Sequence, residues 1–119
     1  MSDGRERAKQ PEDLARLFVE RGNAHDAAGL ADLYEPDAVV GFPPGQVTVG
    51  RDAIRVLYEK MLAANPRFEL EEPLPTLIHG DIALTATRPK DKAGSRAQVA
   101  RRQADGTLLR VIDRPESRG

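Results

Sequence analysis

The chain has 119 residues, no Cys, and 18 Lys plus Arg against 19 Asp plus Glu, so its formal net charge is −1. The length predicts one domain, and the near-neutral charge offers no general attraction to nucleic acid or to an anionic membrane surface. The lack of Cys excludes disulfides, a thiolate nucleophile and a Cys-based zinc site. Together with a polar N-terminus that has no signal peptide or membrane span, it favours a cytoplasmic protein.

The N-terminal residues predict a tail followed by a helix. Residues 1–10 are mostly polar and charged, and we expect them to form a disordered tail outside the fold. After Pro11, apolar residues recur every three to four positions and predict a helix over residues 11–22. We place one domain at residues 11–115 and a short second tail at residues 116–119.

Two further helices are predicted before the middle of the chain. Asp26 can cap the first of them, because its side-chain oxygen can accept a hydrogen bond from a backbone N–H in the first turn. That helix is expected to end at Pro36. The other follows Gly50 and carries a continuous apolar stripe until Asn65 ends it.

Beyond residue 67 the helical period disappears and extended segments follow one another. Asp105 and Gly106 are the strongest two-residue hairpin signal in the sequence. Helices followed by strands predict an α+β domain. The predicted strands are residues 38–42, 46–49, 68–72, 74–78, 82–87, 97–103 and 108–113.

Three stretches of the sequence resemble known proteins. Residues 18–42, FVERGNAHDAAGLADLYEPDAVVGF, and residues 50–61, GRDAIRVLYEKM, are similar to the first half of ketosteroid isomerase-like proteins. Residues 99–115, VARRQADGTLLRVIDRP, resemble the closing hairpin of the SnoaL-like and DUF4440 branch. The resemblance implies the cystatin-like cone of the nuclear transport factor 2-like (NTF2-like) superfamily, with three N-terminal helices on a curved mixed sheet around an apolar pocket. It says less about chemistry, because this superfamily hosts isomerases, cyclases, dehydratases and non-catalytic modules.

The catalytic groups of a ketosteroid isomerase are not found in this chain. That enzyme needs a carboxylate base, a tyrosine hydroxyl and a carboxylic acid that stays neutral. In a gapless match the tyrosine falls on Phe18 and the base on Phe42, and neither side chain can exchange a proton. The acid falls near Val99 or Ala100, which have no side-chain donor. Only the supporting Tyr58 remains, so we expect no steroid isomerisation by this mechanism.

Four polar residues are candidates for catalysis: Asp113, Arg102, Tyr58 and Asp37. A two-residue turn in the last hairpin pairs Arg102 with Leu109 and puts it on the face of Asp113, where the pair could bind an anionic or carbonyl-bearing ligand. In the opposite register the same cluster is solvated or lies in an interface, and the sequence leaves both registers open. Tyr58 and Asp37 also have ordinary alternative roles, as a core tyrosine and a turn residue.

The resemblance, with the pocket it implies, predicts an isomerase, cyclase or dehydratase that acts on a small, apolar, polyketide-like molecule. Asp113 or Asp37 would be the base, and Arg102 or Tyr58 the hydrogen-bond donor. The alternative is a non-catalytic ligand-binding or dimerisation module. We expect no cofactor and no metal site, and we expect a homodimer formed through the outer face of the sheet. The predicted pocket residues are Leu14, Phe18, Tyr34, Phe42, Leu57, Arg88 and Val111.

Overall fold

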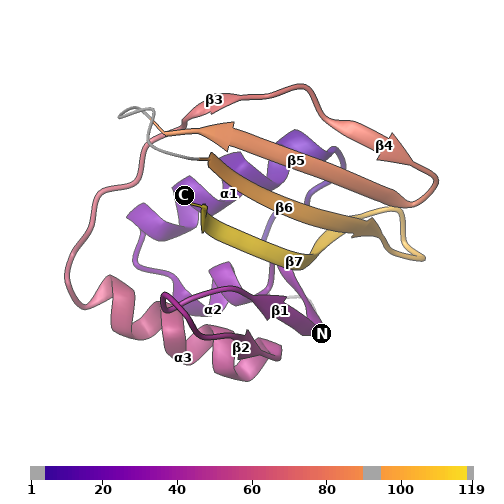
Figure 1. The fold of residues 1–119 in the computed structure, drawn as a ribbon. Coiled ribbons are helices and arrows are strands. Elements are labelled where there is room, and N and C mark those ends of the chain that lie inside the picture. The colour runs from indigo at the N-terminus through magenta and orange to yellow at the C-terminus, as the bar shows by residue number, and fades with distance from the viewer. Residues whose placement is uncertain (1–4, 90–94, 118–119) are drawn as a thin grey trace.

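Three helices lie together on one side of a mixed β-sheet in the computed structural model, which describes residues 5–89 and 95–117 (Figure 1). The helices are α1 (Pro11–Asn23), α2 (Ala27–Ala31) and α3 (Arg51–Leu62). The strands are β1 (Tyr34–Val40), β2 (Thr48–Val49), β3 (Glu72–Pro73), β4 (Leu77–His79), β5 (Ile82–Arg88), β6 (Ser95–Arg102) and β7 (Leu108–Ser117).

The described residues form a seven-stranded sheet in the order β2-β1-β7-β6-β5-β3, with β4 also paired to β5. Strand β1 runs parallel to β7, and the other neighbouring strands are antiparallel. Helix α1 packs on β5 and β7, whereas α3 packs on β1 and β2. The predicted α+β fold, with three helices on a curved mixed sheet, is confirmed.

Local capping explains where the first two helices begin. The Asp13 carboxylate accepts a hydrogen bond from the backbone N–H of Gln10 at 3.0 Å, and Pro11 occupies the first turn, where its missing N–H is not needed. The Asp26 carboxylate accepts from the Gly29 N–H at 2.9 Å, as the sequence predicts. The helix predicted over residues 11–22 therefore agrees with α1 to within one residue.

The second helix is shorter than predicted, because Tyr34 already belongs to β1. The Arg110 N–H donates to the Leu33 carbonyl at 2.8 Å and ties this part of the chain to β7. Pro36 cannot donate to a β-ladder, and it is accommodated where the β1–β7 register shifts between Tyr34 and Val39. Pairing with the sheet thus replaces the last predicted helical turn.

Two of the predicted strands are also shorter in the structure. The segments at residues 68–72 and 74–78 contribute only β3 and β4 to the sheet. Pro73 and Pro75 have no N–H for the ladder, which limits pairing to short edge contacts with β5.

The core lies between the helices and the sheet and is built mainly from Leu, Ile, Val and Ala. Each fully buried aliphatic side chain contributes roughly 1.5–3 kcal/mol to stability. Tyr34 is also completely buried, so its hydroxyl needs a hydrogen-bond partner within the protein. The largest fully buried side chains are Tyr34, Leu14, Leu17, Leu30, Ile54 and Val40.

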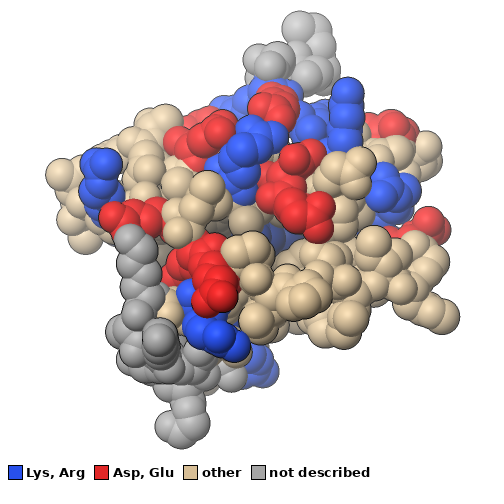
Figure 2. All heavy atoms as spheres, turned by 90° about the horizontal axis from the view of Figure 1, so that it is seen from above, with Lys and Arg blue, Asp and Glu red and all other residues tan. Residues whose placement is uncertain are grey.

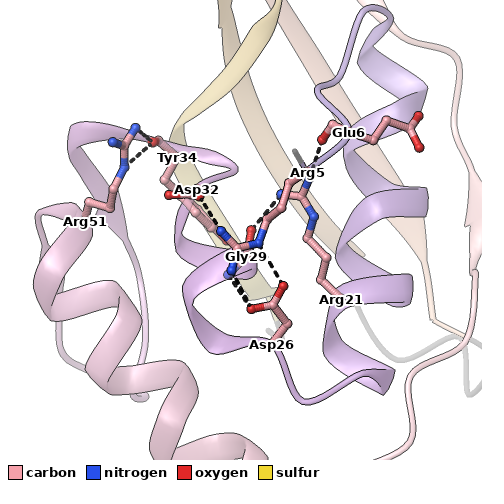
Figure 3. Close-up of polar contacts among 8 residues, drawn as sticks. All are labelled: Arg5, Glu6, Arg21, Asp26, Gly29, Asp32, Tyr34 and Arg51. Atoms are coloured by element: carbon pink, nitrogen blue, oxygen red, sulfur yellow. Dashed lines mark hydrogen bonds and ion pairs between the residues drawn. The ribbon is translucent and has the colours of Figure 1, made fainter. Parts of the chain in front are cut away.

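The N-terminal segment requires a correction, because residues 5–10 belong to the fold rather than to a tail. Ala8 is 2% exposed, and its carbonyl accepts a hydrogen bond from the Leu108 N–H at 2.9 Å. The Arg5 side chain lies between Asp26 and Asp32, with ion-pair distances of 2.9 and 3.1 Å (Figure 3). Composition identified the charges but not their partners, which come from a loop and a helix end distant in sequence. Residues 1–4 and 118–119 of the two predicted tails lie outside the described residues.

The last hairpin also differs from the two-residue turn predicted for it. Its loop is longer, and Arg102 pairs with Leu108 instead of Leu109. The register then shifts on β7, where Val99 pairs with Ile112 but Ala100 pairs with Arg110. Val111 is the extra residue of this bulge, and a bulge changes which side chains share a face of the strand. As a result Arg110 and Asp113 are both buried beneath the sheet, although they are three residues apart.

Candidate functional site

A cavity of about 260 Å³ lies between the sheet, α1, α3 and the segment at residues 67–71. Helices α1 and α3 provide about half of its apolar wall, and β5, β6 and β7 provide most of its polar groups. This combination of an apolar wall with a few polar groups is typical of small-molecule sites. The apolar lining includes Phe18, Val40, Phe42, Leu57 and Met61.

Two tyrosines and an aspartate form a hydrogen-bonded chain beside this cavity. The Tyr34 hydroxyl donates to Asp113 Oδ2 at 2.5 Å, and the hydroxyls of Tyr34 and Tyr58 lie 2.7 Å apart. A hydroxyl has one proton to donate, so the proton between the tyrosines comes from Tyr58. Tyr58 and Asp113 line the cavity, whereas Tyr34 holds the carboxylate from the core side.

Arg110 supplies a positive charge at the same place. Arg110 is 4% exposed, and its Nη1 lies 3.7 Å from Asp113 Oδ2. The guanidinium carbon lies 5.3 Å from the ring centre of Phe18 and 6.0 Å from that of Tyr34, distances at which cation–π attraction stabilises a desolvated cation. The pair is therefore held by both charge and aromatic contacts.

One donor and one acceptor of this buried pair have no hydrogen-bond partner among the described residues. They are Arg110 Nε and Asp113 Oδ1. Leaving a buried polar atom unpaired costs about 1–3 kcal/mol, so such atoms are rare and require an explanation. Both atoms are buried, so each side chain must rotate before a polar group in the cavity can pair with them.

The electrostatic surroundings keep both tyrosines neutral and Arg110 charged. Burial raises the pKa of Tyr34 and of Tyr58, and the nearby Asp113 charge raises both further. Burial by itself would lower the pKa of Arg110, but Tyr34 and Asp113 outweigh that effect and the pKa is raised. Near neutral pH the site thus contains two hydroxyl donors and a permanent cation.

A second polar group closes one side of the cavity. Arg96 Nε lies 2.9 Å from Glu71 Oε1, and Arg96 Nη1 donates to the Pro115 carbonyl at 2.6 Å. Thr87 donates to the same Glu71 oxygen at 2.9 Å. These contacts join the segment at residues 67–71 to β5, β6 and the end of β7.

Five of the predicted site residues line the cavity. Tyr34 lies just behind it, through its bond to Asp113. Leu14 is buried in the core instead. The lining residues are Phe18, Phe42, Leu57, Tyr58 and Asp113.

The other four predicted residues lie elsewhere. Arg102 lies at the end of β6 opposite Leu108, where it is exposed and donates to the Gly106 carbonyl at 2.7 Å. Val111 is the bulge residue and does not line the cavity. Arg88 and Asp37 are exposed, and Arg88 pairs with Glu72 on the outer sheet face at 3.8 Å.

Arg110 is a cavity residue that the sequence analysis did not include among its predicted site residues. In a regular strand, residues three apart point to opposite faces, so Arg110 and Asp113 cannot both be placed inward from their spacing. The one available signal was the uncertain register of the last hairpin. The described residues contain no group of three or more His, Asp or Glu side chains that could hold a metal ion.

The cavity beneath a curved mixed sheet, with three helices on one side, defines an NTF2-like domain with a cystatin-like fold. The chain belongs to the SnoaL-like domain family, whose model matches residues 15–112. The predicted superfamily is therefore confirmed. No curated protein sequence matches the chain, and no helix in the described residues is long and apolar enough to cross a membrane.

Solved structures show the same fold at low sequence identity. A domain from Thiobacillus denitrificans, named provisionally as a calcium/calmodulin-dependent protein kinase type II association domain, is 19% identical with a TM-score of 0.73, covering 95% of this chain and 100% of that one. A ketosteroid isomerase-like protein from Erwinia carotovora atroseptica is 18% identical with a TM-score of 0.65, covering 87% and 89%. A protein from Catenulispora acidiphila in complex with S-DNPA is 18% identical with a TM-score of 0.65, covering 86% of each chain. At these identities the similarity concerns the fold alone.

Proposed function

We propose that this protein binds a small, largely apolar organic molecule and catalyses a proton transfer on it, with Asp113 as the base. The observation that carries this proposal is a carboxylate that is 2% exposed, lines the cavity and has one oxygen without a hydrogen-bond partner among the described residues. The torsion of an aspartate carboxylate is soft, so a small rotation presents Oδ1 to a bound ligand. Isomerisation, cyclisation and dehydration can all begin with such a step.

The proposed step is abstraction of a proton from the carbon next to a ligand carbonyl. The proton moves to Asp113, and the C–H electron pair moves into the carbonyl, which becomes an enolate. Arg110 stabilises the developing negative charge on the oxygen, and Tyr58 can turn its hydroxyl toward it. Return of the proton to another carbon completes an isomerisation, whereas attack of the enolate on a second carbonyl gives a cyclisation. Tyr34 keeps the carboxylate in place and so acts as a positioning residue.

The size of the cavity limits the ligand. A cavity of about 150 Å³ holds benzene, so about 260 Å³ suits a molecule of one or two rings. Proton transfer at such a carbon requires no redox cofactor or metal, and we propose none. The lack of Cys in the chain is consistent with a cytoplasmic location.

The test is exchange of the α-protons of 2-tetralone, a two-ring enolisable ketone, for deuterium in D₂O. The protein should accelerate the exchange above buffer, and Asp113→Asn should reduce the acceleration by about 10²–10⁴-fold. Asp37→Asn is the matched control, because this carboxylate is exposed and outside the cavity. Equal exchange by the wild type and Asp113→Asn would exclude Asp113 as the base.

A non-catalytic binding module is the second candidate. It is favoured by Phe18 and Phe42, which line the cavity at the positions where a ketosteroid isomerase would carry its tyrosine and its base. A ligand present at a hundred times its dissociation constant should stabilise the fold by about 2.7 kcal/mol. Thermal stabilisation by 2-tetralone without proton exchange would support binding alone.

We also propose a homodimer through the outer face of the sheet. Cross-strand pairs place six aliphatic side chains in one row that crosses the sheet, roughly 24 Å long at about 4.8 Å per strand. Ion pairs flank the row on both sides, Arg101 with Glu35 at 3.0 Å and Arg88 with Glu72 at 3.8 Å. An apolar centre with a polar rim is typical of interfaces, and the same row on a second copy can pack against it under twofold symmetry. The row is Leu77, Leu84, Val99, Ile112, Val39 and Val49.

Analytical ultracentrifugation tests the dimer. Ile112 is 51% exposed at the centre of the row, so Ile112→Lys should give a monomer. Val56→Lys is the matched control, because Val56 is 41% exposed on α3 and should leave the dimer intact. A monomeric wild type would contradict the proposal.

A further inference from the structure

We infer that the cavity selects ligands without net charge whose polar head presents a hydrogen-bond acceptor beside a donor. A primary amide, a lactam and an enolised 1,3-dicarbonyl share this chemistry. The inference deepens the proposed function by naming a ligand class, and it rests on ligand binding in this cavity rather than on catalysis.

The first support is the charge balance of the lining. Arg67, Arg96 and Arg110 provide three positive charges, and Glu69, Glu71 and Asp113 provide three negative charges among the described residues. The two most buried of these ions face each other at the floor, and Glu71 and Arg96 pair at the side. A ligand ion would enter this space without a counter-charge, and a buried ion without one is strongly disfavoured.

The second support is the pair of unpartnered atoms at the floor. Arg110 Nε offers one N–H donor, and Asp113 Oδ1 offers one acceptor. Arg110 Nη1 and Asp113 Oδ2 lie 3.7 Å apart, so the two side chains can address the same compact polar group once a small rotation turns the two buried atoms toward the cavity. An amide-like head fits, because its carbonyl accepts from Arg110 and its N–H donates to Asp113.

Charged heads of the same shape fit only half of this site. A carboxylate has two acceptor oxygens and no donor, so one of them would face Asp113 Oδ1. An amidinium has donors only, so one of them would face Arg110 Nε. A carboxylate or an amidinium would also add a net charge to the cavity. Ligands of the same shape that differ only in the charge of the head therefore test the inference directly.

The experiment compares 2-naphthamide, 2-naphthoate and 2-naphthamidinium, which share one two-ring body. Titration calorimetry near neutral pH should show that the wild type binds the amide at least about tenfold more tightly than either ion. Asp113→Asn gives the lining a positive charge and should shift the preference toward naphthoate. Arg110→Gln gives it a negative charge and should shift the preference toward naphthamidinium.

Two matched controls make the same charge changes outside the cavity. Asp37→Asn and Arg102→Gln alter exposed side chains, and neither should change the order of the three ligands. Because Arg110→Gln leaves a buried carboxylate without its cation, it can fail to fold. The double variant Arg110→Met with Asp113→Leu removes both polar atoms while keeping the charge balance. It should lose the preference for the amide and bind all three probes weakly.

Several results would overturn the inference. One is that the wild type binds either ion as tightly as the amide. Another is that it binds none of the three probes. The third is that the order of affinities stays unchanged in Asp113→Asn. The 2-tetralone experiment is a separate measurement. A preference for the amide without proton exchange would support this inference and contradict the catalytic proposal. Proton exchange without a preference for the amide would support the catalytic proposal and contradict this inference.

Discussion

Among the described residues, two buried arginines differ in what surrounds them. Arg21, on α1, is 8% exposed and donates from Nη1 to the Gly29 carbonyl at 2.7 Å and from Nη2 to the Glu6 carbonyl (Figure 3). Burial and the nearby Arg5 charge lower its pKa. Arg110 is 4% exposed, faces a carboxylate and two aromatic rings, and has its Nε without a partner among the described residues.

The comparison shows that burial of a charge does not by itself mark a functional site. Arg21 joins the N-terminal segment to α2, and main-chain carbonyls accept its hydrogen bonds, which is a structural role. Arg110 lines a cavity and leaves hydrogen-bonding capacity unused. The charges on the outer surface do not mark a site in the same way, because acidic and basic side chains are interspersed on the face shown in Figure 2.

The largest expected effect is on stability when Arg110 alone is removed. Arg110→Met leaves Asp113 buried without its cation and should lower the free energy of unfolding by about 3–5 kcal/mol. Urea denaturation measures it, with exposed Arg102→Met as the control that should change little. Adding Asp113→Leu should recover most of the loss. Wild-type stability of Arg110→Met would contradict the claim that the buried Asp113 carboxylate depends on this cation.

The second effect is a loss of stability in alkali caused by the two tyrosines. The unfolded chain loses both tyrosine protons near pH 10, whereas the folded chain keeps them to higher pH because their pKa values are raised. The stability that the two tyrosines contribute is fully present below their pKa in the unfolded chain. It is lost as the pH rises through their pKa in the folded protein. The slope should reach about 2.7 kcal/mol per pH unit.

The control for that slope is a variant without tyrosine. Tyr34 and Tyr58 are the two tyrosines of the sequence, so the double substitution to Phe removes the whole contribution. Denaturation curves across the alkaline range should then be flatter for the variant than for the wild type. Identical slopes would show that the hydroxyls are not held as the site requires.

Removing Arg21 should have an intermediate effect. Arg21→Met deprives two main-chain carbonyls of charged donors and should lower the free energy of unfolding by about 1.5–3 kcal/mol. The affinity for 2-naphthamide should stay at the wild-type value, because Arg21 does not line the cavity. A change in ligand order in this variant would weaken the contrast between the two arginines.

The smallest effect is expected at Arg5. In its ion pair with Asp26, the Arg5 side chain is 29% exposed and the Asp26 side chain is 32% exposed. Such pairs contribute at most about 1 kcal/mol. Arg5→Met should therefore change thermal stability less than Arg21→Met does, and the reverse order would show that the N-terminal segment depends on Arg5 rather than on Arg21.

Local signals predicted several elements well. Asp26 and Pro11 were interpreted correctly as helix-start residues, because capping depends on neighbours a few positions away. The strand content after residue 67 was also correct in outline. The errors occurred at Tyr34, which pairs with β7, and in the last hairpin, where a bulge altered the register. Both depend on contacts between segments distant in sequence.

By itself the sequence determined the α+β class, the SnoaL-like resemblance and the absence of a complete set of ketosteroid isomerase groups, because residue identities and short-range periodicity carry that information. The tertiary structure decided which polar residues meet. One inserted residue at Val111 changes the faces of a strand, so it brings Arg110 to the side of Asp113, whereas Arg102 lies outside the cavity at the end of β6. No pattern in the sequence states where a strand bulges, since that depends on the partner strand and on the cavity beneath it.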